Sequence, residues 1–114
     1  MEKRIKNINA EEILSLEEQV SYLPGQIVSK TLAQNRAVSL TLFAFDQGEE
    51  ISSHDSAGDA MVTVLDGAGA LTIDGKTYTL RKGETIVMPA GKPHAVYAPE
   101  RFKMLLTVVF PPEL

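Results

Sequence analysis

The feature that most constrains the fold is a series of short apolar or alternating segments that begins at residue 38 and continues almost to the end of the chain. In the first segment Val38, Leu40 and Leu42 alternate with other residues, which places all three on one face of a strand. Each segment is soon followed by a glycine or proline that favours a turn. We expect strands at residues 27–28 with Leu32 at the end, and at 38–43, 60–65, 70–73, 77–80, 85–88, 95–97 and 104–110.

The turns between these segments carry their own signals. Asp74-Gly75 between two alternating runs predicts a type I′ hairpin, in which Lys76 could lengthen the loop. Gly67 follows a strand at a position where glycine tolerates a positive φ at little cost. Short strands with regular turns and little helix predict an all-β barrel or sandwich.

One short helix is expected ahead of the strands. Asn9 is a favourable N-cap, and Glu12 stands three residues later, where a capping box places an acid. The turn signal YLPG at residues 22–25 would close the segment. A small apolar face would come from Ile13, Leu14 and Leu16.

Composition excludes several classes of protein. The 114 residues fit one domain. A domain of this size buries roughly two-thirds of the surface that its unfolded chain exposes, so it needs no disulfide to fold. The lack of cysteine excludes thiolate metal sites and cysteine nucleophiles. A net charge of −4 with scattered basic residues argues against a nucleic-acid partner. With no apolar signal sequence and no run near the ~20 residues of a membrane helix, we expect a cytoplasmic protein without a membrane partner.

The only two histidines of the chain lie in two glycine-bounded motifs. The motif GETIVMPAGKPH runs from Gly83 to His94, with two prolines and a glycine just before the histidine. The motif GEEISSHDSAGDAMVTVLDG runs from Gly48 through His54 to Gly67. The glycine and proline spacings of both resemble the two motifs of the cupin superfamily, and the resemblance covers residues 38–110.

This resemblance implies a small double-stranded β-helix, the jelly-roll or cupin barrel, forming one domain over residues 1–114 with a ligand pocket at the barrel mouth. It also implies a homodimer, and we expect the contact in the N-terminal helix and strand at residues 9–32. The chain departs from the family pattern at three positions. Ser56 stands in place of a second histidine, Ala60 in place of a glutamate, and Ala98 in place of an asparagine.

The resemblance further implies that His54 and His94 point into the barrel and bind one divalent metal. Imidazole nitrogen suits Zn, Ni, Fe, Mn or Cu. Two histidines leave coordination positions open, and Asp59 is the expected additional ligand. Imidazoles that share one ion would lie within about 5 Å of each other. The alternative is that each histidine only caps a turn and that the barrel holds no metal.

Three functions stay open on this evidence. The first is a protein that binds a small molecule in the barrel interior, with a partial metal site. The second is a metal-dependent oxygenase or isomerase that uses His54 and His94. The third is a metal-free enzyme with one of these histidines as the general base. The sequence identifies no ligand, no substrate and no catalytic residue.

Overall fold

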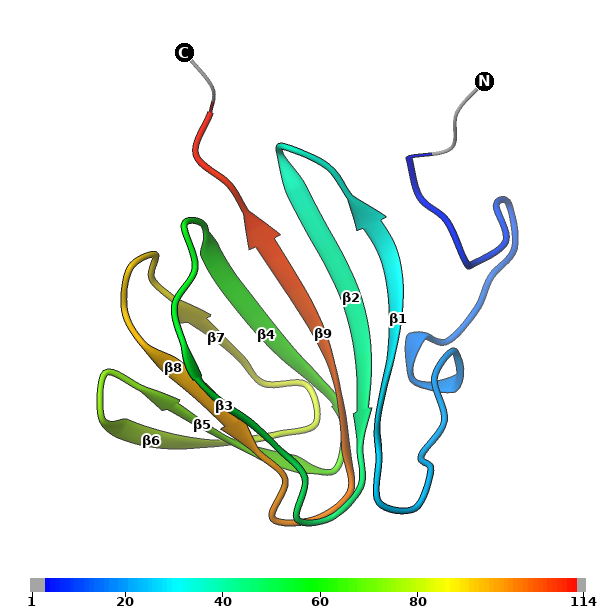
Figure 1. Ribbon diagram of the computed structural model, residues 1–114. Helices are drawn as coiled ribbons and strands as arrows, with labels where there is room; N and C mark the ends of the chain where they lie inside the picture. Colours follow the sequence, from blue (N-terminus) through cyan, green and yellow to red (C-terminus); the bar gives the residue numbers. More distant parts are fainter. Residues whose placement is uncertain (1–3, 113–114) are drawn as a thin grey trace.

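The computed structural model describes residues 4–112 and shows two antiparallel sheets that face each other (Figure 1). One sheet has five strands in the order β1-β2-β9-β4-β7, and the other has four in the order β3-β8-β5-β6. This arrangement is all-β, as predicted, and forms a double-stranded β-helix. The strands are β1 (Ile27–Gln34), β2 (Val38–Phe45), β3 (Glu50–His54), β4 (Asp59–Asp66), β5 (Ala68–Ile73), β6 (Lys76–Arg81), β7 (Thr85–Met88), β8 (His94–Tyr97) and β9 (Phe102–Val109).

The structure contains every predicted strand and one that was not predicted. In the hairpin of β5 and β6, Ile73 pairs with Lys76, so the loop is the two-residue Asp74-Gly75 and Lys76 does not lengthen it. Asp74 has φ 49° and Gly75 has φ 85°, as a type I′ turn requires. The unpredicted strand is β3, which contains a single apolar residue, Ile51, and lies at a sheet edge where it pairs with β8 alone.

The N-terminal helix is much shorter than the capping signal predicts. Between residues 4 and 26 the structure has only a 3-10 turn, η1 (Leu16–Glu18). The expected contact does form, since Asn9 Nδ2 donates to Glu12 Oε2 at 3.1 Å, but Glu11 has φ 61°, which a right-handed helix does not allow. The segment instead packs Val20 against the five-stranded sheet. The segment packs apolar side chains on the sheet instead of forming a helix, because an isolated short helix is only marginally stable in water.

Apolar side chains fill both faces of β2. Phe45 on its inner face belongs to the barrel core between the sheets, where its ring stacks on Phe102 with centroids 4.6 Å apart. Leu42 and Ala44 on its outer face form a second cluster with Val20 of the N-terminal segment. The N-terminal segment therefore covers part of the outer face of the five-stranded sheet.

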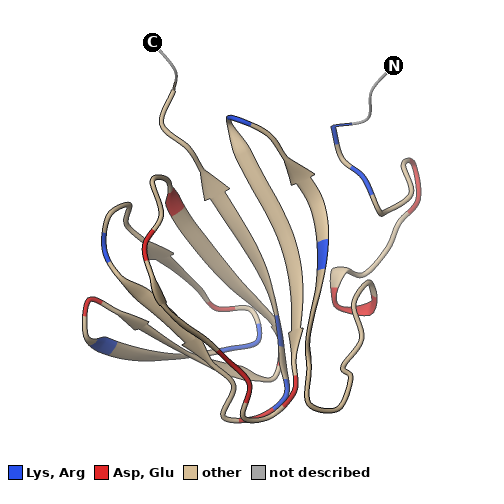
Figure 2. Cartoon of the chain, viewed as in Figure 1, with Lys and Arg blue, Asp and Glu red and all other residues tan. Residues whose placement is uncertain are grey.

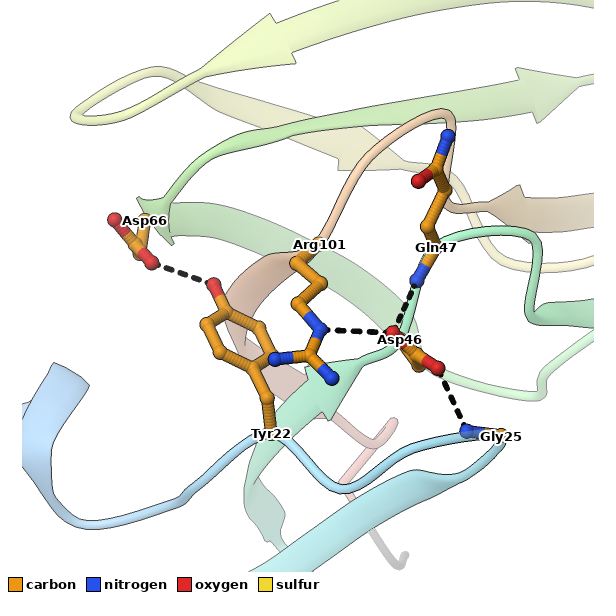
Figure 3. Close-up of polar contacts among 6 residues, drawn as sticks. All are labelled: Tyr22, Gly25, Asp46, Gln47, Asp66 and Arg101. Atoms are coloured by element: carbon orange, nitrogen blue, oxygen red, sulfur yellow. Dashed lines mark hydrogen bonds and ion pairs between the residues drawn. The ribbon is translucent and has the colours of Figure 1, made fainter.

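A polar cluster fixes the N-terminal segment to the barrel (Figure 3). Tyr22 Oη donates to Asp66 Oδ2 at 2.5 Å, and Asp46 accepts from Gly25 N at 2.6 Å and from Arg101 Nε at 2.8 Å. The hydrogen bond from Gly25, followed by that from Arg101, lowers the pKa of Asp46. Burial, followed by the bond to Asp66, raises the pKa of Tyr22, so the phenol stays protonated. These contacts hold residues 22–25 against the ends of β2 and β4.

Charged residues lie mainly in turns and near strand ends, and the middle of β2, β4 and β9 carries few of them (Figure 2). Within residues 4–112 no helix has the length and apolar character needed to cross a membrane.

Candidate functional site

The two histidines meet at one end of the four-stranded sheet. His54 is the last residue of β3, His94 is the first residue of β8, and the two stand opposite each other in the antiparallel pair. Their ring centroids are 4.3 Å apart and the ring planes are inclined by 68°. This separation agrees with the expected limit of about 5 Å. His94 is only 5% exposed, whereas His54 is exposed, so the pair extends from the solvent toward the barrel interior.

Local backbone structure explains why the sequence brings the pair together. A register shift in β3 between Ile51 and His54 sets His54 opposite His94. The loop before His94 is joined to the loop after His54, because Gly91 N donates to Ser56 O at 2.9 Å. Gly91 has φ 79°, a conformation that favours glycine. The prolines and glycine before His94 therefore shape a turn that delivers His94 to the start of β8.

The two imidazoles make the same hydrogen bond. His54 Nδ1 lies 2.9 Å from the carbonyl oxygen of Ser52, and His94 Nδ1 lies 3.2 Å from that of Lys92. A carbonyl oxygen only accepts, so Nδ1 carries the proton in each ring. In the neutral tautomer Nε2 then presents a lone pair. A bond from one ring nitrogen to a backbone carbonyl is the usual support of a histidine that ligates metal through its other nitrogen.

The surroundings of His94 favour its neutral form. Burial lowers the pKa of His94 below its ordinary value, and the nearby His54 lowers it further. The hydrogen bond with Lys92 and the charge of Asp55 act in the opposite direction without reversing the shift. A neutral imidazole is the form that can bind a metal or accept a proton.

This pKa shift predicts how stability depends on pH. Because His94 binds a proton more weakly in the folded chain, the unfolded chain takes up more protons between the lowered pKa and about 6.5. The free energy of unfolding should therefore rise with pH across that window. As the pH falls through the window, protonation of His94 in the unfolded chain removes this stability. We expect chelator-treated protein to melt at a lower temperature on acidification, and His94→Asn to weaken this dependence. Equal pH dependence in the two proteins would contradict the assignment.

The remaining positions considered as metal ligands do not join the histidine pair in one cluster. Asp59 stands at the start of β4, and its Oδ1 accepts from Ala90 N at 2.8 Å. Ser56 Oγ accepts from Gly58 N at 3.2 Å, and Ala60 is 2% exposed in the barrel core. Among residues 4–112 no group of three or more His, Cys, Asp or Glu side chains is placed to hold a metal. Asp59 as an additional ligand stays a prediction.

The barrel beneath His94 is filled by apolar side chains. Ile73 of β5 pairs with His94, and Met88 and Val108 of the facing sheet are buried in the same core. Within residues 4–112, one groove of about 1350 Å³ lies away from the histidines, along the N-terminal segment and the β1–β2 hairpin, and another of about 240 Å³ lies beside η1. A ligand of the histidine pair would therefore approach on the exposed side of His54, at the mouth of the barrel.

The sequence identifies both histidines but not the carbonyl groups that orient them. Both acceptors lie two residues before their histidine, at Ser52 and Lys92. A backbone carbonyl is present at every position, so no residue type could have identified these two.

Comparison with known proteins agrees with this architecture. A family model described as a cupin domain matches residues 41–110. The crystal structure of a conserved protein of unknown function from Streptococcus pyogenes superposes with a TM-score of 0.95 at 47% identity, covering 98% of each chain. A cupin superfamily protein from Desulfitobacterium hafniense DCB-2 superposes with a TM-score of 0.91 at 32% identity, covering 96% of this chain and 100% of that chain.

A more distant likeness concerns an enzyme. Salicylate 1,2-dioxygenase from Pseudoaminobacter salicylatoxidans superposes with a TM-score of 0.69 at 20% identity, covering 82% of this chain and 27% of that chain. At this identity the likeness shows a shared barrel alone. The activity of the present chain has to be argued from its own residues.

Proposed function

Because the chain belongs to the cupin family, we propose that it binds a small molecule at the mouth of its barrel, where His54 and His94 hold a divalent metal ion. The observation that carries this proposal is the pair of Nδ1–carbonyl bonds, which leaves both Nε2 atoms as acceptors on rings 4.3 Å apart. When bound, such an ion would supply Lewis acidity toward an oxygen atom of the ligand.

The donor set indicates which ions fit. Two neutral imidazoles favour Cu, Ni or Zn over Mn or Fe, since affinity for nitrogen ligands follows this order. Open coordination positions would be filled by water and by the small molecule itself. A ligand with two oxygen donors should therefore strengthen metal binding, and the metal should strengthen ligand binding by the same factor.

A second candidate function is a metal-free enzyme with a histidine as the general base. The lowered pKa of His94 supports it, because a neutral ring can accept a proton. His94 is however 5% exposed, so a substrate would reach the exposed His54 more readily. Turnover that survives chelation would support this function over the metal-dependent one.

The test is metal titration of protein purified without an affinity tag. We expect wild type to bind one Zn²⁺ or Ni²⁺ in calorimetry, and His54→Ala and His94→Ala each to weaken binding at least about tenfold through the loss of one of two nitrogen ligands.

Asp59→Asn is the matched control, because it removes a carboxylate near the site and leaves both imidazoles. Unchanged affinity in this variant would restrict the site to the histidines, and weaker affinity would identify Asp59 as the additional ligand. Equal binding by wild type and by the double variant His54→Ala/His94→Ala would overturn the proposed metal site.

A further inference from the structure

The loop between β7 and β8 leads directly into His94, and each of its backbone N–H groups has an acceptor. The loop runs from Pro89 to Pro93, and neither proline has an N–H group. Three donors therefore remain. Their hydrogen bonds are Ala90 N to Asp59 Oδ1 at 2.8 Å, Gly91 N to Ser56 O at 2.9 Å, and Lys92 N to Pro89 O at 3.4 Å.

Only one of these three acceptors belongs to a side chain. Among residues 4–112, the carboxylate of Asp59 is the one side chain that accepts a hydrogen bond from residues 89–93. The other two acceptors are backbone carbonyl groups, which every residue type provides. A hydrogen bond to a carboxylate is charge-assisted and therefore stronger than a bond between neutral groups. Asp59 is thus the hydrogen-bond partner of the loop that a substitution can remove.

The place of Asp59 in the five-stranded sheet explains why its carboxylate reaches the loop. At the end of the β4–β7 pair, Ala60 stands opposite Met88. Asp59 is the residue before Ala60, and Ala90 is the second residue after Met88. On its other side Asp59 pairs with Val109 of β9. The carboxylate therefore projects from a paired strand and gives the loop a fixed point of attachment.

The loop transmits this constraint to the imidazole of His94. The carbonyl group of Lys92, two residues after Ala90, lies 3.2 Å from His94 Nδ1. The carbonyl group of Pro93 accepts from Asp74 N at 2.8 Å, so the loop is also held at its other end. If Ala90 were free to move, the carbonyl of Lys92 would lose its direction toward Nδ1. His94 would then also populate the tautomer with the proton on Nε2, which cannot bind metal through that nitrogen.

We propose that Asp59 is a positioning residue of the histidine pair, which fixes the tautomer of His94 by holding the loop. Asp59 then acts on a metal ion through His94 and not as a ligand. His54 provides a contrast within the same molecule, since its Nδ1 faces the carbonyl of Ser52 in its own strand. The effect of Asp59 on metal affinity rests on the proposed function, whereas its effect on the tautomer exists without metal.

The first test is ¹⁵N nuclear magnetic resonance of both imidazoles in metal-free protein at mildly alkaline pH, where the rings are neutral. Asp59→Ala removes the acceptor, so we expect Nε2 of His94 to become partly protonated while His54 keeps its proton on Nδ1. Asp59→Asn retains an oxygen acceptor, so its His94 should match that of wild type. Asp55→Ala is the matched control, because it removes an exposed carboxylate whose charge acts on His94 but which accepts no hydrogen bond from the loop.

Two results of this comparison would overturn the proposal. One is a His94 tautomer in Asp59→Ala that equals the tautomer in wild type. The other is a change of the same size in Asp59→Asn or Asp55→Ala, which would assign the effect to lost charge and not to the lost acceptor.

Metal titration of the same variants separates a positioning role from that of a ligand. Asp59→Ala should weaken Zn²⁺ binding about tenfold or more, the usual cost of removing a group that supports a metal-binding histidine, and Asp59→Asn should stay close to wild type. Equal weakening in both variants, with an unchanged tautomer in Asp59→Ala, would make Asp59 a ligand and refute the positioning role. If wild type binds no Zn²⁺, the proposed function fails, while the tautomer of His94 still decides the role of Asp59.

A further measurement needs no variant. If opening of the loop weakens Zn²⁺ binding by some factor, Zn²⁺ must disfavour that opening by the same factor. Hydrogen exchange of the Ala90 amide should therefore slow in protein saturated with Zn²⁺. The amide of Gly25 is the control, since it also donates to a carboxylate, Asp46 Oδ2 at 2.6 Å, but lies in the N-terminal segment. Exchange at Ala90 that Zn²⁺ leaves unchanged, or slows no more than at Gly25, would contradict the coupling.

Discussion

Replacing Gly67 with alanine is expected to lower the free energy of unfolding by about 2–5 kcal/mol, from a backbone cost of ~1–2 and a steric cost of ~1–3. Gly67 joins β4 of one sheet to β5 of the other and has φ 69°. A Cβ atom there would stand 2.1 Å from the carbonyl oxygen of Arg101 and 3.1 Å from Phe102 Cα. Both neighbours are backbone atoms, so the strain cannot be relieved by a side-chain rotation.

Gly83→Ala separates the backbone cost of a positive φ from the steric cost of a Cβ atom. Gly83 has φ 87°, but a Cβ atom there meets no atom within 4 Å. This variant should therefore lose only the backbone contribution, about 1–2 kcal/mol. Urea unfolding of both variants measures the difference. Equal losses would show that the close approach of Arg101 to Gly67 does not contribute.

The second large effect is expected at the centre of the barrel. Phe102→Ala should cost about 3–5 kcal/mol, the usual range for a fully buried phenylalanine. Phe102 is 0% exposed, stacks on Phe45 with an inclination of 14°, and has ring atoms 2.5–2.9 Å from where a Cβ of Gly69 would be. Its removal would therefore leave a cavity bounded by an aromatic ring and by the backbone of β5.

Phe43→Ala provides the matched control for Phe102→Ala. Phe43 lies in the same barrel, with its ring centroid 5.9 Å from that of Phe45, but it is only partly buried. We expect a smaller loss of stability for Phe43→Ala in the same urea experiment. A larger loss for Phe43→Ala would contradict the assignment of the core centre to Phe45 and Phe102.

Much of the barrel could be predicted because its signals are local. The alternation in β2 and the Asp74-Gly75 turn depend on residues adjacent in sequence, and each was found where expected. Strand β3 was missed because it is a polar edge strand that exists through its pairing with β8. The N-terminal helix was predicted from Asn9 and Glu12, whose side chains do meet, but contacts with the distant sheet decided the backbone conformation.

The two histidines of the candidate site could be predicted from the sequence, but the groups that orient them could not. The motif spacings located His54 and His94, and the structure brings their rings together. The carbonyl acceptors at Ser52 and Lys92 depend on loop geometry that residue types do not specify. The difference in exposure between the buried His94 and the exposed His54 likewise depends on the tertiary arrangement of the two sheets.

The most direct test of the metal site is ¹⁵N nuclear magnetic resonance of the imidazole nitrogens during a Zn²⁺ titration. The chain has only two histidines, so both ring systems can be followed without ambiguity. We predict that both rings carry the proton on Nδ1 before metal is added, and that both Nε2 resonances shift together and saturate at one ion per chain. Protonation on Nε2, or Nε2 resonances that Zn²⁺ leaves unchanged, would contradict the two-histidine site.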